Sequence, residues 1–144
     1  MGSVTPGSRC CHLRKLDRLG ARKVTIFSHA NYNNDGFDID SKNVLIEDCD
    51  IDADDDAIAV KSESDPSFAV TNVVVRNCRL ASMAYPFKVG TGSYGDVMDI
   101  LVEDCAFSRT KMNHRFPWSK LVAGITNDLS GICGIGLQCV DGGR

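Results

Sequence analysis

The chain has 144 residues, of which 43% are hydrophobic, and a formal net charge of −3. This length suits a single domain, and no run of 18 apolar residues is present that would indicate a membrane span. The charge is unevenly spread, because residues 24–144 carry a net −8, and so acidic a body disfavours nucleic acid as a partner.

The beginning of the chain is basic. Residues 1–23 hold six Lys or Arg and one acid, Asp17, and they contain no apolar stretch of the kind found in a signal peptide. We therefore expect a disordered head over residues 1–22 and a folded domain over 23–144.

A repeat runs through the folded part. Four similar stretches start 20, 29 and 27 residues apart: KVTIFSHANY from Lys23, NVLIEDCDID from Asn43, NVVVRNCRLA from Asn72 and DILVEDCAFS from Asp99. A period of 20–50 residues with one strand-like core per unit is typical of a solenoid. The shared cysteine of three repeats (Cys49, Cys78 and Cys105) predicts a buried column rather than a zinc or disulfide site.

Each repeat also has a second short segment, at 36–40, 57–61, 86–90 and 134–138. When these segments are aligned, the second and fourth columns are apolar and the third and fifth are mixed. Alternation with a period of two predicts strands with the apolar columns inward and the mixed columns, including Lys61 and Lys88, outward. The connections lack a helical stripe, so turns join the strands and successive strands pair in parallel. The pattern predicts an all-β parallel β-helix of about four coils, whereas the motif of a leucine-rich repeat is absent.

The last coil is longer than the others. Residues 108–132 form an expected insertion loop between two strands, and such loops on rigid scaffolds often carry function. The chain has no recognisable cap at either end of the solenoid, and open ends expose strand edges. We therefore expect this partial β-helix to be a fragment of a longer one.

Carboxylates gather just ahead of two of the second strands. Asp35 precedes Gly36 and Asp56 precedes Ala57, so stacking places the two acids in one column on adjacent coils, with Asp55 one residue back in the column of Asn34. Acids this close cannot all ionise easily, so at least one carboxyl should have a raised pKa. A protonated acid beside an ionised one is what glycoside hydrolysis requires.

Two other interpretations of these acids remain. Asp and Asn are common at solenoid turns because their side chains bond to neighbouring backbone, which suits Asp50 and its neighbours. A calcium loop is the second, because four acids fall at positions 1, 3, 5 and 12 of an EF-hand-like segment, although the sixth position is Ala57 instead of the usual glycine: Asp52, Asp54, Asp56 and Glu63.

At these motifs the chain resembles glycoside hydrolase family 28, the polygalacturonase family of right-handed parallel β-helices. NNDGFDID (33–40) is similar to the family's Asn-Thr-Asp-Gly segment, and DDDAIAVKS (54–62) is similar to its Gly-Asp-Asp-Cys-Ile-Ala-Ile-x-Ser segment. YPFKVGTGSYGD (85–96) falls where the family has His-Gly followed by Ile-Gly-Ser. The resemblance spans roughly residues 20–144.

The resemblance implies inverting hydrolysis of α-1,4-linked galacturonate in pectin, by a monomeric, secreted or periplasmic full-length enzyme without a cofactor or a metal. Carried over, Asp55 is the general acid, and Asp35 and Asp56 activate water. The expected partner is a pectic polysaccharide or oligosaccharide, with neither nucleic acid nor membrane involved. The expected substrate-binding residues are Asn34, Lys61, Tyr85, Lys88 and Arg115.

The sequence also departs from the family pattern. The family's catalytic-site His falls at Tyr85, the Gly before the Asp pair is Asp54, and the Arg-Ile-Lys segment that binds the substrate carboxylate falls at 136–138, which reads Gly-Leu-Gln. Lys61, Lys88 and Arg115 are candidate substitutes as cationic partners of a uronate, although Lys61 could instead pair with Asp40 one coil away. A catalytically inactive carbohydrate-binding β-helix, or a purely structural one, is the alternative function.

Overall fold

The structure is a computed structural model that describes residues 11–30, 33–63, 69–89, 95–108 and 117–125, the last range for its backbone only. Every regular element in these ranges is a strand, and no described helix has the length and apolar character to cross a membrane. The strands are β1 (Cys11–Arg22), β2 (Thr25–Ser28), β3 (Phe37–Glu47), β4 (Asp50–Ala53), β5 (Ile58–Val60), β6 (Val70–Arg76), β7 (Arg79–Ser82), β8 (Phe87–Val89), β9 (Val97–Ser108) and β10 (Pro117–Ile125).

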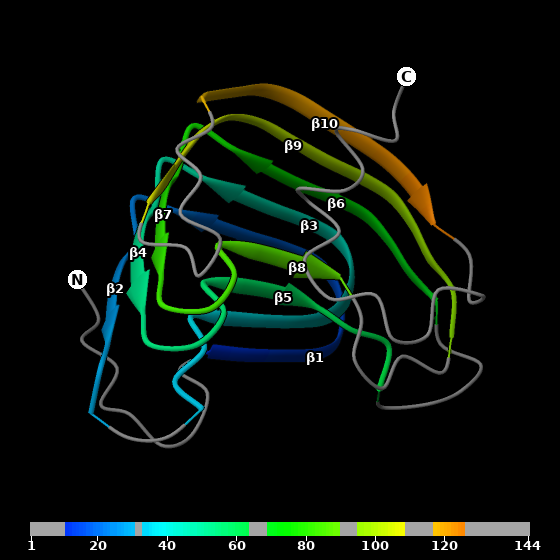
Figure 1. The fold of residues 1–144 in the computed structure, drawn as a ribbon. Helices are drawn as coiled ribbons and strands as arrows, with labels where there is room; N and C mark the ends of the chain where they lie inside the picture. The colour runs from blue at the N-terminus through cyan, green and yellow to red at the C-terminus, as the bar shows by residue number, and fades with distance from the viewer. Residues whose placement is uncertain (1–10, 31–32, 64–68, 90–94, 109–116, 126–144) are drawn as a thin grey trace.

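The strands form three walls, because β1, β3 and β9 are long enough to bend from one wall into the next (Figure 1). Wall A contains the first halves of β1 and β3 together with β5 and β8. Wall B contains the second halves of β1 and β3, then β6 and β9. Wall C contains β2, β4, β7 and the end of β9. The chain visits the walls in the order A, B, C and repeats.

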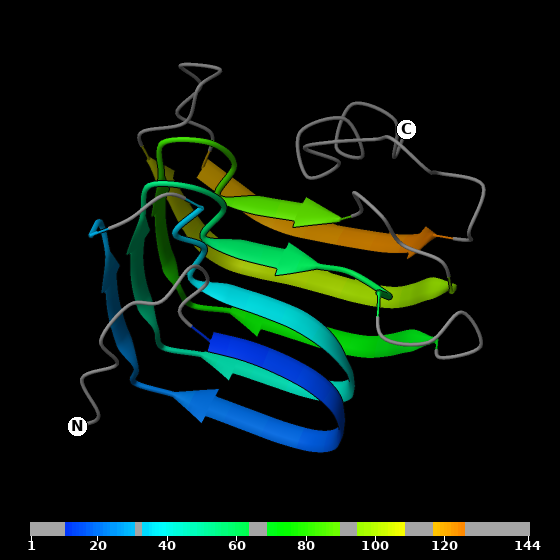
Figure 2. The same cartoon turned by 90° about the horizontal axis from the view of Figure 1, so that it is seen from below.

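Strands of successive coils pair in parallel within each wall, as in Phe37 with Ile58 and Ile58 with Phe87. The predicted parallel β-helix is therefore confirmed. From Cys11 to Phe87 the chain makes three full turns, and in the described residues each wall contains four parallel strands, to which β10 adds an antiparallel strand beside β9. In the turned view of Figure 2, the coils follow one another from blue to orange in chain order.

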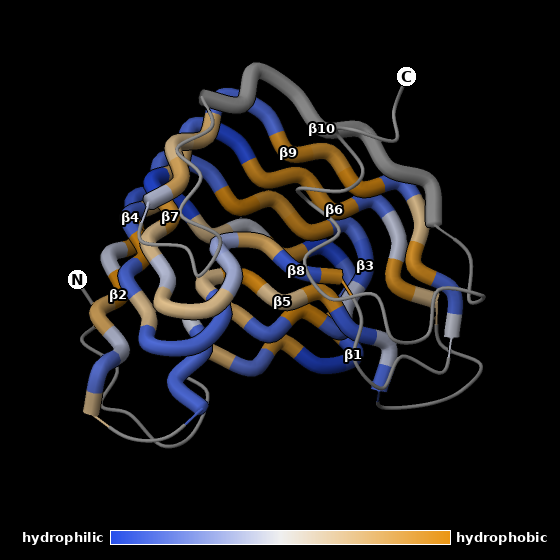
Figure 3. Tube along the Cα trace, in the orientation of Figure 1, coloured by the Kyte–Doolittle hydropathy of each residue, from blue (hydrophilic) through white to orange (hydrophobic). Residues whose placement is uncertain are grey.

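The buried apolar side chains of the three walls form one core, and Figure 3 shows the hydrophobic residues along the strands that supply it. Strand alternation directs every second side chain inward, and the apolar columns predicted to face inward are buried: Phe37, Ile58 and Phe87 in one, Ile39, Val60 and Val89 in the other. Cys49, Cys78 and Cys105 are likewise buried as free thiols, so the predicted cysteine column is confirmed.

Left-handed residues turn the chain at two corners of every coil. The corner that lies within β1, β3, β6 and β9 has positive φ at Arg18, Asn43, Asn72 and Asp99. The corner between walls B and C has positive φ at Lys23, Asp48, Asn77 and Asp104. Asn and Asp tolerate this conformation best among residues with a side chain, and they fill six of these eight positions.

The expectation of a disordered head over residues 1–22 is wrong in the part that the structure describes. Cys11–Arg22 forms β1, which pairs with β3 along both walls, and residues 1–10 lie outside the described ranges. Strand pairing is possible because alternate residues pack against the core: Cys11, Leu13, Leu19 and Ala21. The Lys/Arg side chains between them obscured this alternation.

Because β1 is the first strand of the solenoid, the register of the first repeat differs from the one predicted. Leu19 pairs with Val44, so Arg18 is the equivalent of Asn43, and the first interval is 25 residues rather than 20. The Lys23 stretch instead enters wall C, where Ile26 pairs with Ile51. Both stretches begin with a polar residue at positive φ, so the two corners resemble each other in sequence.

The expected insertion loop at 108–132 is also wrong in part. Residues 117–125 form β10, which runs antiparallel to β9 from Pro117 opposite Ala106 to Ile125 opposite Val97. This pairing covers the backbone edge of β9 that would otherwise remain open. The rest of that range and the fourth second strand, predicted at 134–138, lie outside the described residues.

Candidate active site

The site lies at the corner where wall C passes into wall A, in the second and third coils. The segments 33–36 and 54–57 run side by side there, because the Gly36 N–H donates to the Asp56 carbonyl (2.9 Å) and the Asp55 N–H donates to the Asn34 carbonyl (3.3 Å). Strand-like pairing thus continues through the corner. It aligns Asp35 with Asp56, as the repeat predicted.

Gly36 allows the two segments to approach this closely. A Cβ at Gly36 would lie 2.3 Å from the Ala57 carbonyl oxygen and 2.5 Å from Cγ2 of Ile51, which is shorter than any carbon contact allows. Because Gly36 has no side chain, the carboxyl group of the preceding Asp35 lies close to the next coil.

The fourth coil holds the corner from its other side. The Ala57 N–H donates to the Tyr85 carbonyl (3.0 Å), and the Ser82 hydroxyl donates to the Asp55 carbonyl (2.6 Å). The predicted column of Asp35, Asp56 and Tyr85 is therefore present, with Asp56 in the middle. Backbone bonds on both sides limit the movement of its main chain.

Three acids converge here, and we call Asp35, Asp55 and Asp56 the carboxylate cluster. One oxygen from each carboxyl group lies within 4.8 Å of the other two. Asp35 is 4% exposed and Asp56 2%, whereas Asp55 is half-buried. Asp55 is therefore the member of the cluster that solvent reaches, while the other two carboxyls are withdrawn from bulk water.

Two lysines from wall A contact the cluster. Nζ of Lys88 lies 3.0 Å from Oδ2 of Asp56, and Nζ of Lys61 lies 3.8 Å from Oδ2 of Asp35. Lys61 also lies 3.3 Å from Oδ1 of Asp38 and 4.0 Å from Oε1 of Glu63. The structure thus brings the two predicted cationic residues to the acids, on the outer face predicted for them.

Burial and charge change the acidity of the cluster. Burial, together with the neighbouring Asp38 and Asp55, raises the pKa of Asp35 to about 7, although Lys61 opposes the rise. Burial also raises the pKa of Asp56, and the hydrogen bond and charge of Lys88 act in the opposite direction. The raised pKa of Asp35 and the raised pKa of Asp56 agree with the prediction that at least one carboxyl of the cluster has a raised pKa.

The other residues predicted to bind substrate are less uniformly placed. Asn34 is buried on the coil before Asp55, and its backbone carbonyl accepts a hydrogen bond from the Asp55 N–H. Tyr85 is half-buried, with the Lys88 ammonium 5.7 Å from its ring centroid. Arg115 and residues 136–138 lie outside the described residues.

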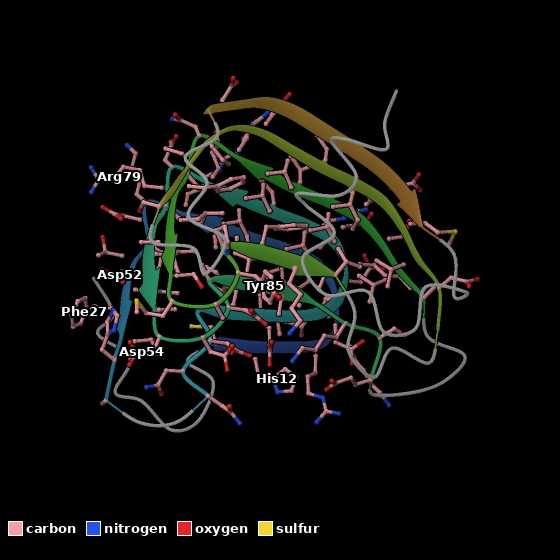
Figure 4. All side chains as sticks on the ribbon, in the orientation of Figure 1. His12, Phe27, Asp52, Asp54, Arg79 and Tyr85 are labelled. Carbon is pink, nitrogen blue, oxygen red and sulfur yellow. The ribbon has the colours of Figure 1, made fainter. Side chains whose placement is uncertain are left out.

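Sequence reasoning missed three residues of the outer face of wall A. Asp38 is the third residue of the segment 36–40, in a column of mixed character, yet it is 1% exposed and contacts Lys61. His12 and Arg14 are exposed on β1, in register with Asp38 and Asp40. Figure 4 shows His12 below Tyr85 on the stack of wall A strands. The alternation of Cys11 and Leu13 with these residues was the available signal.

The calcium-loop interpretation is wrong, because its acids point to different places. His29 bonds to Asp52 through Nε2 (2.7 Å) and to Asp54 through Nδ1 (2.5 Å) on wall C, beside the exposed Phe27 (Figure 4). Asp56 instead contacts Lys88 on wall A. The carboxylate cluster is the group of oxygen ligands close enough to share a cation in the described residues. However, two ammonium groups already compensate its charge.

The fold is a β-solenoid, and its outer face carries a cluster of two buried carboxyls and one accessible carboxyl. Carboxyl groups placed in this way are the groups that general acid/base chemistry uses. The model of the family "Glycosyl hydrolases family 28" matches residues 8–133 of the chain, and the chain belongs to this family. Its class is therefore that of the glycoside hydrolases. No curated protein and no solved structure matches the chain. The match begins ahead of β1, which agrees with the inclusion of that strand in the fold.

Proposed function

We propose that the chain hydrolyses galacturonate-containing pectic polysaccharide by an inverting acid/base mechanism. The observation that carries the proposal is the convergence of Asp35, Asp55 and Asp56, whose oxygens lie within 4.8 Å of one another, at the positions that resemble the family's acid and base. The half-buried Asp55 is the proposed general acid, and the buried pair Asp35 and Asp56 is proposed to hold and activate water.

In the proposed reaction Asp55 donates its proton to the glycosidic oxygen as the bond from that oxygen to the anomeric carbon breaks. Water attacks the anomeric carbon from the opposite face and loses a proton to the Asp35–Asp56 pair. The products are a reducing sugar and a free hydroxyl on the leaving chain, so protons and electron pairs balance. Positioned acid and base groups each contribute about 10²–10⁴-fold to such reactions.

The stereochemical outcome is proposed from the family resemblance and not from spacing. Inverting glycosidases hold their two carboxyl groups about 6.5–9.5 Å apart and retaining ones about 5–5.5 Å. The closest oxygens of the cluster lie within 4.8 Å, which is a shorter measure than the distance between carboxyl groups. The anomer of the first product, read by proton NMR before mutarotation, measures the outcome directly.

Cationic groups on the same face support an acidic substrate. Lys61 divides its ammonium among several acids, so it can turn toward a substrate carboxylate while keeping an acidic neighbour. His12 and Arg14 add exposed basic groups one coil earlier. We propose that these three side chains serve the role that the family gives to its Arg-Ile-Lys segment.

The proposal is tested by Asp55→Asn, which keeps the shape of the side chain and removes its proton. Release of reducing ends from polygalacturonate and related pectic fragments should fall by about 10²–10⁴-fold. Asp104→Asn, at an exposed corner far along the chain from the cluster, is the matched control and should retain activity.

Undiminished release by Asp55→Asn would contradict the role of Asp55. Binding of oligogalacturonate by the unmodified chain without turnover at any pH between 4 and 8 would instead favour the inactive carbohydrate-binding β-helix, to which the replacement of the family His by Tyr85 also points.

A further inference from the structure

The two lysines of wall A are distributed unequally over the carboxylate cluster. The Lys88 ammonium lies 3.0 Å from Asp56, and both side chains are largely buried, at 14% and 3% exposure. The Lys61 ammonium lies farther from Asp35, at 3.8 Å, and it is shared with Asp38 and Glu63. The compensation of charge is therefore strongest at Asp56.

This difference matters for the pair that activates water. A carboxyl can accept a proton from water only when it is ionised, and two buried acids in one column on adjacent coils resist ionising together. As the pH rises, the carboxyl with a direct ammonium partner ionises first, because attraction to the opposite charge offsets part of the cost of removing the carboxylate from water. The other remains available as a neutral hydrogen-bonding partner of the water.

Lys88 is itself held in place. It is carried by β8, the strand that follows Tyr85, and its ammonium lies 5.7 Å from the centroid of the Tyr85 ring. Attraction between a cation and an aromatic ring stabilises such an arrangement, more so when both are partly desolvated. Tyr85 and Lys88 together occupy the part of the column where the family has its histidine.

We propose that Lys88 is a positioning residue that makes Asp56 the ionised, water-activating member of the Asp35–Asp56 pair. This inference rests on the proposed function for its catalytic meaning, but the ion pair itself does not depend on the substrate. The charged groups that face Asp56 are Asp55 on its own segment, Lys61 beyond β5, Asp35 on the preceding coil and Lys88 on the following one. The raised pKa of Asp35, about 7, is consistent with its neutral role.

The experiment is a titration of the aspartate carboxyl carbons by NMR in the whole chain without substrate, with Asp56→Asn used to assign the Asp56 signal. Lys88→Met removes the ammonium and retains the length of the side chain. The Asp56 midpoint should move up by about 1–3 pH units, the usual effect of an opposite charge within contact distance. Lys88→Arg should restore most of the original value.

Two variants serve as controls. Arg79→Met breaks the exposed Arg79–Asp50 pair on wall C and should leave the Asp56 midpoint in place. Lys61→Met should move that midpoint less than Lys88→Met does, because Lys61 is centred on Asp35 and Asp38. If Lys88→Met does not fold, Lys88→Gln replaces it with the same expected shift.

An unmoved Asp56 midpoint in the neutral Lys88 variant, or an equal shift in Arg79→Met, would overturn the inference. In parallel, the acid limb of kcat/KM on polygalacturonate should move to higher pH by the same interval. Absence of hydrolysis by the unmodified chain would count against the proposed function alone, because the NMR midpoint decides the role of Lys88 independently.

Discussion

Gly36 sets the distance between two coils at the point where the acids meet. Its N–H donates to the Asp56 carbonyl, and its Cα faces the Ala57 carbonyl and the Ile51 side chain so closely that a single added methyl group has no space. Asp35 precedes it and takes its position from the same contact. One small residue thus serves both the packing of the coils and the approach of the carboxyls.

We predict that Gly36→Ala destabilises the chain by about 3 kcal/mol, because the backbone of the next coil must move to admit the Cβ. The free energy of unfolding in urea measures the loss. Gly20→Ala is the matched control, since a Cβ there meets nothing within 4 Å, and it should be neutral or slightly stabilising. Equal stability of the two variants would show that the coils can separate at little cost.

At the scale of the element, each coil depends on its corners as much as on its strands. Asn43 donates to Asp17 and Asn72 donates to Asn43, so the side chains of one corner form a ladder from coil to coil. The second corner repeats this with Asn77 bonded to Asp48. Lys23 occupies the same corner in the first coil, where it has φ of 52° without the short polar side chain of its equivalents.

We predict that Lys23→Asn stabilises the chain by about 0.5–1 kcal/mol, because Asn tolerates positive φ better than Lys. The midpoint of urea unfolding is the measurement. Thr25→Asn, two residues later at an exposed position of β2, should change stability in the opposite direction because Asn is unfavourable in strands. A destabilised Lys23→Asn would contradict the strain at this corner.

At the scale of the whole molecule, stability and the site are linked through protons. The pKa of Asp35 is raised from 3.8 to about 7, so the folded chain holds a proton that the unfolded chain releases between those values. His29 acts in the same direction, because burial lowers its pKa but the bonds to Asp52 and Asp54 more than reverse this and raise it. Each group therefore stabilises the folded state at low pH and loses this contribution as the pH rises from its ordinary pKa to its raised pKa.

We predict that the free energy of unfolding falls as pH rises from about 4 to about 7, with up to about 4 kcal/mol of the change due to Asp35. Asp35→Asn should flatten this fall and make the chain more stable than the unmodified one above pH 7, while lowering activity. Urea unfolding at a series of pH values measures the slope. Asp104→Asn, the exposed control, should keep the slope, and an unchanged slope in Asp35→Asn would contradict the buried, protonated Asp35.

Much of the architecture was predictable because it repeats. The apolar columns of wall A and the stacking of Asp35 with Asp56 follow from alternation and period, which depend on neighbours along the chain. The same reasoning failed at β1, where long basic side chains interrupt the alternation. It also failed at β10, because this strand pairs antiparallel with the open edge of β9 and is not part of the repeat. Edge effects have no local signature.

The sequence by itself determined the solenoid class, the inward columns and the column that contains the candidate acids, because a strand of period two and a coil of 20–30 residues place equivalent side chains above one another. Only the tertiary structure decided that Asp38 and Lys61 are buried on the outer face and that Lys88 contacts Asp56. Those outcomes depend on which coils meet and how closely, and thus on desolvation and on charges from other coils, which no stretch of sequence contains alone.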